Sequence, residues 1–234
     1  MTPVSRLGKD VLREAGPWTP TIQRLLTHLR EKGIDWCPEA RGWTEDGREQ
    51  LSYLKGKVPE YPLPRWVYDE SVLVDAAKRL RELHDATADY DDPDALWRAP
   101  IRKPAEVVCH NDFAPYNMVF RDHVLTGIID WDFASPGPRV WDLAFLAYSL
   151  VPLMRPDSPD APNLTLDLGR RMKILLESYG CDESVPSLLQ NVILRLEDLA
   201  EFTHSHARAR KDKQLLEHAE SYSADASYLR SLLG

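Results

Sequence analysis

The sequence predicts an α+β protein in which a small lobe containing strands precedes a larger, mainly helical lobe. In the first 56 residues, short apolar runs alternate with glycine-containing turns, as in small β-structures. After residue 139, apolar residues recur at helical spacing over most of the chain. The proline-rich run Val58–Pro64 follows Gly56 and is typical of a linker. We therefore expect two domains, residues 1–56 and residues 57–234.

The first lobe is expected to hold four short strands and one helix. Residues 4–7 and 11–13 suit two strands around a glycine turn, and two more are expected at about 39–43 and 49–54. Thr19 suits the N-cap of the intervening helix, since Pro20 follows it in the first turn. Gly33 is the expected end of that helix.

The second lobe is expected to begin with a helix over about residues 69–88 and a β-hairpin. Residues 117–120 and 124–129 suit the two strands of this hairpin, joined by the polar turn 121–123. Four further helices are expected at 140–151, 165–179, 185–209 and 211–232.

Composition limits the classes of protein to which the chain can belong. Its 234 residues, of which 43% are hydrophobic, are enough for one compact unit or two small lobes. We find neither a run of about 18 apolar residues, the length that crosses a membrane, nor an apolar N-terminal signal segment. Three widely spaced cysteines, Cys37, Cys109 and Cys181, suit a reducing compartment, so we expect a cytoplasmic protein. The net charge of -8 argues against nucleic acid as a partner and is compatible with a cationic small molecule.

The residues that indicate chemistry lie in His110–Asn117 and around Asp130. The first segment holds the pattern H-x-D-x-x-x-x-N, and an apolar run ending at Asp130 follows it. Phosphoryl transfer from a nucleotide needs a carboxylate near the attacking hydroxyl and hard oxygen ligands for Mg²⁺. Asp112 suits the first role, and Asn117 and Asp130 suit the second. The expected hairpin would bring Asn117 and Asp130 close together, with Asp112 on the loop just before it.

These segments resemble the catalytic and metal-binding loops of the aminoglycoside phosphotransferase family, which is related in fold to protein kinases and choline kinases. The run Trp141–Ala144, the pair Leu83–His84 and the run Leu51–Gly56 resemble the same family. The resemblance implies a two-lobe protein-kinase-like fold and transfer of the γ-phosphate of ATP or GTP to a hydroxyl of a small molecule. It also implies Mg²⁺ as a cofactor, and aminoglycoside-type antibiotics are one class of acceptor that it suggests.

The resemblance also implies how a nucleotide is held. The adenine would lie against four residues at the end of the first lobe, Leu51, Ser52, Tyr53 and Leu54.

The chain departs from the kinase pattern where the phosphates would bind. No glycine-rich loop precedes Val4, and Arg13, with Lys9 nearby, stands where the pattern has a lysine. Ile22 or Gln23 falls near the place of the expected helix glutamate. We therefore expect a shortened N-terminal lobe in which Arg13 and Lys9 contact the phosphates.

Three further residues are expected to support the site. His110 is expected to hold its loop through a hydrogen bond, and a role as a base is the alternative. Asp142 is expected to accept hydrogen bonds from the backbone near the catalytic loop. For Asp132, both a supporting role beside the metal ligands and no role are open.

The helix expected at 185–209 carries a group of acidic residues. Glu197 and Glu201 lie one turn apart, with Asp198 beside them. The resemblance implies that acidic helical residues in this lobe line the substrate cleft and attract cationic compounds. A solvated helix face is the alternative interpretation.

Two other classes of function remain open. A kinase-like binding protein that has lost phosphate handling would explain the missing glycine-rich loop, but not the intact set of Asp112, Asn117 and Asp130. A metal-dependent hydrolase would use His110, Asp112 and Asp130, but no further histidines stand at ligand spacing nearby. The identity of the acceptor, the choice between ATP and GTP, and the oligomeric state are left open by the sequence.

Overall fold

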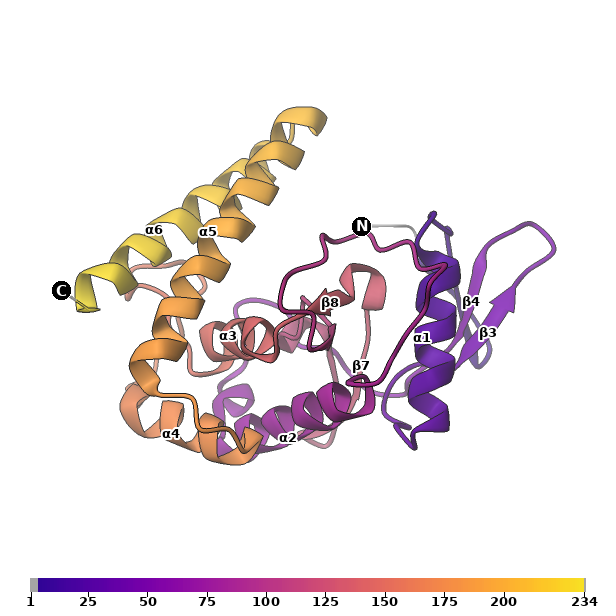
Figure 1. The fold of residues 1–234 in the computed structure, drawn as a ribbon. Coiled ribbons are helices and arrows are strands. Elements are labelled where there is room, and N and C mark those ends of the chain that lie inside the picture. The colour runs from indigo at the N-terminus through magenta and orange to yellow at the C-terminus, as the bar shows by residue number, and fades with distance from the viewer. Residues whose placement is uncertain (1–3, 234) are drawn as a thin grey trace. The chain divides into compact units, whose positions relative to one another are not determined.

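The computed structural model of the protein describes residues 4–233 and has the expected α+β content (Figure 1). The chain forms two compact units, one of Met1–Pro59 and Lys78–Asp142 and the other of Glu60–Ala77 and Leu143–Gly234. Helix α2 (Glu70–Ala86) contributes residues to both units. The division expected at residues 56 and 57 stays a prediction.

The first unit contains an antiparallel four-stranded sheet with the strand order β1-β2-β4-β3. The turns between β1 and β2 and between β3 and β4 contain Gly8 and Gly47, whose φ angles of 63° and 79° lie where glycine meets no strain. The four expected strands are confirmed, although the last ends two residues earlier than expected. Their bounds are β1 (Val4–Leu7), β2 (Asp10–Arg13), β3 (Ala40–Trp43) and β4 (Glu49–Ser52).

Helix α1 (Thr19–Glu31) lies beside this sheet (Figure 1), because one of its faces is apolar. Thr19, the expected N-cap, is instead the first helical residue, and Trp18 occupies the N-cap position. The Thr19 hydroxyl accepts a hydrogen bond from the Gly16 N–H at 2.8 Å, so it stabilises the turn before the helix. The fully buried residues of the apolar face are Ile22, Leu25, Leu26 and Leu29.

The expected hairpin is present as β6 (Met118–Arg121) and β7 (Val124–Ile128). Asp122 and His123 connect the strands with φ angles of 49° and 65°. Two consecutive residues with positive φ are typical of the type I′ turn, whose twist matches that of a two-stranded hairpin. The hairpin prediction is confirmed.

A second two-stranded pairing was not expected from the sequence. Strand β5 (Val107–Cys109) pairs antiparallel with β8 (Ser135–Gly137), so the segment between them closes into one large loop containing the hairpin. Short 3₁₀ helices lie at η2 (Pro115–Asn117) and η3 (Trp131–Phe133) within that loop. Both ends of the H-x-D-x-x-x-x-N pattern are therefore held by strands.

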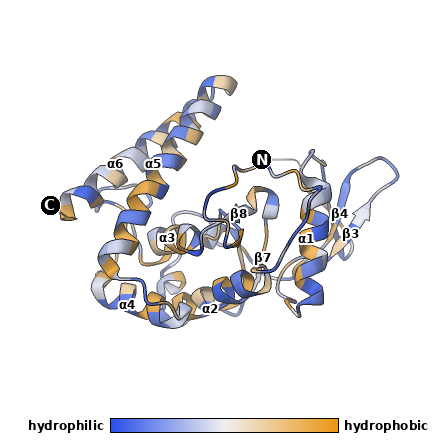
Figure 2. Cartoon of the chain, viewed as in Figure 1, coloured by the Kyte–Doolittle hydropathy of each residue, from blue (hydrophilic) through white to orange (hydrophobic). Residues whose placement is uncertain are grey.

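The second unit is helical, as expected. Helix α3 (Arg139–Leu150) passes from the first unit into the second. Helix α4 (Leu168–Tyr179) begins at an Asp167 side-chain cap and ends at Gly180, and Figure 2 shows polar and apolar residues alternating along it. Helices α5 (Val185–Arg210) and α6 (Lys213–Leu233) pack along one another (Figure 1), and the 3₁₀ helix η1 (Arg65–Tyr68) precedes α2. Between residues 4 and 233, no helix combines the length and the apolar character that crossing a membrane requires.

Candidate active site

The catalytic-loop pattern lies between β5 and β6, and Asp142 in the first turn of α3 fixes its backbone. The fully buried Asp142 carboxylate accepts hydrogen bonds from the N–H groups of His110 at 2.6 Å and Asn111 at 2.7 Å. It also accepts one from His84 Nε2 at 3.2 Å. Asn111 has a φ of 64°, in the left-handed region that most non-glycine residues avoid and that asparagine tolerates better than most. Asp142 thus makes the backbone contacts expected of it.

His110 is fully buried, and both of its ring nitrogens have partners. Nε2 lies 3.1 Å from the Ile129 carbonyl, and Nδ1 accepts a hydrogen bond from the Asp112 N–H at 3.3 Å. These contacts fit a neutral ring that carries its proton on Nε2. Burial lowers the pKa of His110 below its ordinary value, which also favours the neutral ring. The arrangement favours the structural role over the role of a base.

Asp112 is half-buried, and each of its carboxylate oxygens accepts a hydrogen bond. The Tyr116 hydroxyl donates to Oδ1, and the Asn117 side-chain amide donates to Oδ2 at 2.8 Å. Burial raises the pKa of Asp112 above its ordinary value, although the hydrogen bond from Tyr116 acts in the opposite direction. A carboxylate with a raised pKa is suited to take a proton from a hydroxyl group.

Asn117 and Asp130 lie at the open end of the hairpin. The Asn117 amide nitrogen also donates to the Asp112 carbonyl at 2.9 Å, so both of its contacts are acceptors and the orientation of the amide is defined. The Ile129 N–H donates to the Asn117 carbonyl at 2.9 Å, which places Asp130 one residue beyond the position opposite Asn117. Asp130 has a φ of 63° and a side chain that is 49% exposed. The fold brings Asp112, Asn117 and Asp130 together, and their chemical roles stay predictions.

Arg13, at the end of β2, links the four-stranded sheet to the segment after β7. Its Nη2 donates to Asp132 Oδ1 at 2.6 Å, its Nη1 lies 3.7 Å from Asp130 Oδ1, and its Nε donates to Glu49. Burial alone would lower the pKa of Arg13, but the charges of Glu49, Asp132 and Asp130 raise it. Arg13 is therefore a fixed cation beside Asp130.

Asp132 connects Arg13 to a second arginine. Its Oδ2 accepts a hydrogen bond from Arg98 Nη1 at 3.3 Å. The Arg98 guanidinium lies over the rings of Trp18 and Phe133, 4.5 and 4.3 Å from their centres. Asp132 is thus part of an ion-pair network that holds the segment carrying Asp130, which favours a supporting role.

The other residues predicted to bind nucleotide lie on and next to the same sheet. Lys9 is exposed in the turn between β1 and β2. The Leu54 side chain packs against Gly127 of the hairpin, where a Cβ would come within 2.6 Å of it. The predicted adenine-binding residues divide between β4, which holds Leu51 and Ser52, and the chain just after it, which holds Tyr53 and Leu54.

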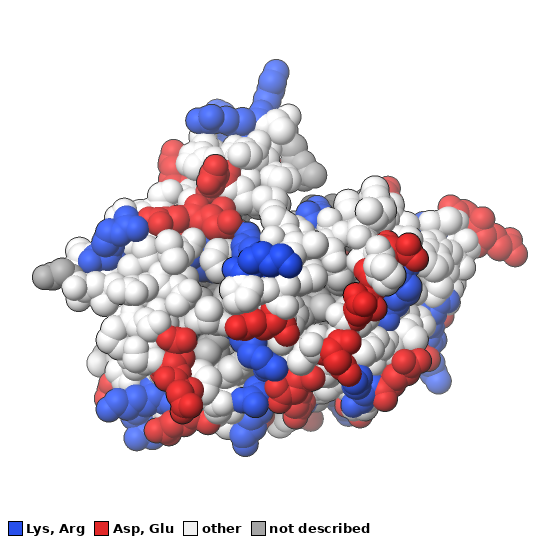
Figure 3. All heavy atoms as spheres, viewed as in Figure 1, with Lys and Arg blue, Asp and Glu red and all other residues white. Residues whose placement is uncertain are grey.

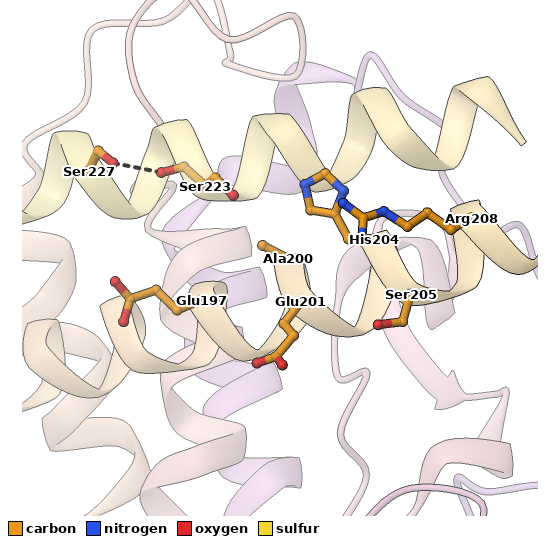
Figure 4. A pocket seen from close by; sticks show the side chains of 8 residues that line it. All are labelled: Glu197, Ala200, Glu201, His204, Ser205, Arg208, Ser223 and Ser227. Atoms are coloured by element: carbon orange, nitrogen blue, oxygen red, sulfur yellow. Dashed lines mark hydrogen bonds between the residues drawn. The ribbon is translucent and has the colours of Figure 1, made fainter.

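The three acidic residues of α5 belong to the second unit. Glu197 and Glu201 line a groove of about 540 Å³ between α5 and α6, and Figure 4 shows Glu201 pointing away from α6. Glu197 forms an ion pair with Arg230 at 2.5 Å, whereas Asp198 lies outside the groove lining, 3.6 Å from Arg195. Figure 3 shows acidic side chains over this helix pair and basic ones at its tip.

Three supporting residues that carry this arrangement were missed from the sequence. Tyr116 lies inside the motif, four residues after Asp112, so its place in the loop was a usable signal. Arg98 comes from the irregular segment before β5, and nothing in its local sequence points to Asp132. Glu49 likewise reaches Arg13 only through the pairing of β2 with β4.

Comparisons with known sequences identify relatives of the chain. The profile of the phosphotransferase enzyme family matches residues 49–171, the stretch that contains the hairpin and the whole H-x-D-x-x-x-x-N pattern. The trifolitoxin immunity protein of Rhizobium leguminosarum bv. trifolii is 33% identical over 188 residues, covering 76% of this chain and 70% of the relative.

Solved structures show the same fold at low sequence identity. A Plasmodium vivax ethanolamine kinase superposes with a TM-score of 0.67 at 11% identity, covering 99% of this chain and 84% of that one. The gentamicin–APH(2″)-IIa complex superposes with a TM-score of 0.58 at 16% identity, covering 93% and 86% of the two chains. The expected α+β, kinase-like fold is confirmed. By its sequence profile, its curated relative and its fold, the chain belongs to the phosphotransferase enzyme family that it was predicted to resemble.

Proposed function

We propose that the protein transfers the γ-phosphoryl group of ATP or GTP to a hydroxyl group of a small molecule, with Mg²⁺ as the cofactor. The observation that carries this proposal is the arrangement of Asp112, Asn117 and Asp130. The Asn117 amide nitrogen is turned to Asp112, which leaves its amide oxygen available as a ligand. The exposed Asp130 directly follows Ile129, whose N–H donates to the Asn117 carbonyl. One side chain thus orients the candidate base and offers a metal ligand.

The residues around this point suit a divalent cation. Among the described residues, the hydrogen bonds and ion pairs at this point involve four carboxylates and two guanidinium groups. The carboxylates are those of Glu49, Asp112, Asp130 and Asp132, and the guanidinium groups are those of Arg13 and Arg98. Asn117 and Asp130 offer the oxygen ligands that Mg²⁺ prefers. When bound, Mg²⁺ would clamp the nucleotide phosphates and offset their charge.

In the proposed reaction, Asp112 orients the acceptor hydroxyl and accepts its proton. The hydroxyl oxygen forms a bond to the γ-phosphorus while the bond to the β–γ bridging oxygen breaks, so the products are a phosphate ester and ADP or GDP. The raised pKa of Asp112, caused mainly by burial, favours proton transfer to its carboxylate. Tyr116 and Asn117 hold that carboxylate in place.

The nucleotide is proposed to bind the first unit. Arg13 Nη1 faces the phosphates from beside Asp130, and Lys9 adds an exposed positive charge from the β1–β2 turn. The adenine or guanine base lies against the segment Leu51–Leu54. Because such nucleotides are cytoplasmic metabolites, the proposal places the protein in the cytoplasm.

The acceptor is proposed to be a small, cationic, hydroxylated compound. The exposed Glu201 carboxylate would pair with such a compound at the edge of the α5–α6 groove, whereas the Glu197 carboxylate already pairs with Arg230. Relatives include a protein named for immunity to trifolitoxin, and similar folds include an ethanolamine kinase and a gentamicin complex. Antibiotics and small amino alcohols are therefore the classes to test, with antibiotic resistance as the corresponding role.

Thermal unfolding with Mg-ATP and with Mg-GTP tests the donor. A nucleotide at 100-fold its dissociation constant should stabilise the protein by about 2.7 kcal/mol. Release of ADP or GDP should then be measured with an aminoglycoside, a macrolide, choline or ethanolamine added as the acceptor. The Asp112→Asn variant is the inactive control. Stabilisation by neither nucleotide would refute the proposal.

A kinase-like binding protein is the second candidate. It is favoured by Arg13, two of whose three nitrogens are already committed to Glu49 and Asp132. Nucleotide binding without turnover of any acceptor, and without slow hydrolysis, would favour this candidate over the transferase.

A further inference from the structure

Glu49 is a buried charged residue that the proposed reaction does not use directly. It begins β4, has no exposed surface, and accepts hydrogen bonds from two different elements. Arg13 Nε of β2 donates to Oε2, and Gln23 Nε2 of α1 donates to Oε1 at 2.8 Å. Burying a carboxylate costs folding free energy unless the charge is paired, so the presence of a glutamate at this buried position needs an explanation.

The contact with Glu49 fixes the direction of the Arg13 side chain. The guanidinium group is planar, so holding two of its nitrogens also determines where the third one points. Glu49 holds Nε and Asp132 holds Nη2, at 2.6 Å from Oδ1. The third nitrogen, Nη1, is thereby directed to the side of Asp130, 3.7 Å from Oδ1.

Gln23 locks Glu49 in turn. Its amide oxygen accepts the Gly42 N–H at 3.0 Å while its amide nitrogen donates to Glu49, so both ends of the amide are used. Helix α1 therefore contributes a neutral amide, and strand β4 contributes the negative charge. The carboxylate missing from the helix is present on a strand.

We propose that Glu49 is a positioning residue that directs the Nη1 of Arg13 toward the nucleotide phosphates. This inference rests on the proposed function, because it requires a nucleotide beside Asp130. It assigns to Glu49 no contact with the substrate. Its influence on binding must therefore pass through Arg13 and vanish when Arg13 is absent.

A double-mutant cycle tests this dependence. The variants are Glu49→Gln, Arg13→Ala and the double variant, and binding of Mg-ATP and of Mg-GTP is measured by titration calorimetry. Glu49→Gln should raise the dissociation constant at least tenfold in the wild-type background and less than twofold in the Arg13→Ala background. An equal effect in both backgrounds would overturn the proposal. Glu39→Gln is the matched control, because it removes an exposed carboxylate that pairs with Arg41 at 3.0 Å in the same unit, and it should change binding less than twofold.

A stability measurement separates positioning from folding. Each variant is followed by thermal unfolding, and the double variant should melt at a higher temperature than Arg13→Ala, which leaves Glu49 buried without its cation. If Glu49→Gln does not fold, Gln23→Ala replaces it, and a rise of threefold or more in the dissociation constant supports the proposal while no rise overturns it. If wild type binds neither nucleotide, the proposed function fails and this inference fails with it. If wild type binds and Glu49→Gln binds equally well, only this inference fails.

Discussion

Asp142 joins three parts of the first unit through one carboxylate. It accepts hydrogen bonds from two consecutive backbone N–H groups, those of His110 and Asn111, and from the side chain of His84 on α2. Burial alone would raise the pKa of Asp142, but the hydrogen bond and charge of His84 and the contacts with His110 outweigh it. The pKa therefore falls below its ordinary value of 3.8. The carboxylate thus stabilises the fold in its charged form.

Asp142→Asn is expected to destabilise the protein in a pH-dependent way. A native pKa below the unfolded one means that the stabilisation is complete above pH 3.8 and is lost as pH falls through the native pKa. At pH 7 the variant should lose about 3 kcal/mol, as when one member of a buried charged group is removed. Urea unfolding of both proteins from pH 7 downward should show the difference shrinking only below about pH 4. Asp89→Asn is the control, because Asp89 is exposed, and this variant should change the free energy of unfolding little. If Asp142→Asn lost the same stability at every pH, the charged form of Asp142 would not be what stabilises the fold.

Asp112→Asn should remove most turnover while keeping the fold and nucleotide binding. Loss of the base and of its positioning effect typically slows such reactions by ~10²–10⁴-fold. Because burial raises the pKa of Asp112, the charged form is unfavourable in the fold, so the variant should melt at the same or a higher temperature. Initial rates with an identified acceptor, together with thermal unfolding, check both parts. Turnover at the wild-type rate would show that Asp112 is not the base.

Asp130→Ala should impair magnesium-dependent nucleotide binding more than Asn117→Ala does. A carboxylate brings a full charge to the metal, whereas an amide oxygen is neutral. Asn117→Ala should in addition lower turnover, because its amide also holds Asp112. Titration calorimetry with Mg-nucleotide and steady-state rates separate the two effects. Wild-type binding by Asp130→Ala would remove it from the metal site.

The candidate site could be predicted from the sequence where its residues lie in one local segment. Asp112, Asn117 and Asp130 all lie in the loop and hairpin from His110 to Asp130. Their spacing in this short stretch of chain was therefore enough to predict that they lie close together. Arg13 was found only through the family resemblance. Its partner Glu49 was not found, because β2 and β4 pair across 36 residues and no periodicity marks such a contact.

At the scale of elements, turn chemistry explains which predictions were accurate. The hairpin was predictable because its two strands are apolar and its turn is polar, and the β3–β4 turn contains a glycine at positive φ. The pairing of β5 with β8 was not predictable, because β8 is Ser-Pro-Gly, a composition typical of loops. Pairing with β5 imposes the extended conformation on β8.

Two adjacent arginines of helix α4, Arg170 and Arg171, allow a test of how this helix is held in the second unit. Arg171 is buried and donates to the carbonyls of Tyr68 and Leu150, each at 2.7 Å, within the second unit. Arg171→Met leaves two buried carbonyls unpaired and should cost about 3 kcal/mol. The adjacent Arg170 forms an exposed ion pair with Glu70, and Arg170→Gln should be nearly neutral. Urea unfolding of the two variants decides; similar losses would mean that Arg171 does not anchor the helix.

At the scale of the whole molecule, charge limits how a nucleotide can bind. The chain has a net charge of -8, and among the described residues around Asp130 the carboxylates outnumber the guanidinium groups. A triphosphate approaching this point would be repelled by Asp112 and Asp130 unless a cation stood between them. Exposed Lys9 offers little compensation, because its charge is screened over about 8 Å at physiological salt.

Removal of magnesium is therefore expected to abolish nucleotide binding. With Mg²⁺ present, a nucleotide at 100-fold its dissociation constant should stabilise the protein by about 2.7 kcal/mol, and with EDTA the same nucleotide should leave the melting temperature unchanged. Mg²⁺ without nucleotide, and sodium chloride at matched ionic strength, control for nonspecific effects of the ion. Adding Mg²⁺ back should restore the shift in wild type but not in Asp130→Ala. Equal stabilisation by nucleotide with and without EDTA would mean that Asn117 and Asp130 hold no metal on which binding depends, and that the cationic side chains of Arg13 and Lys9 hold the phosphates.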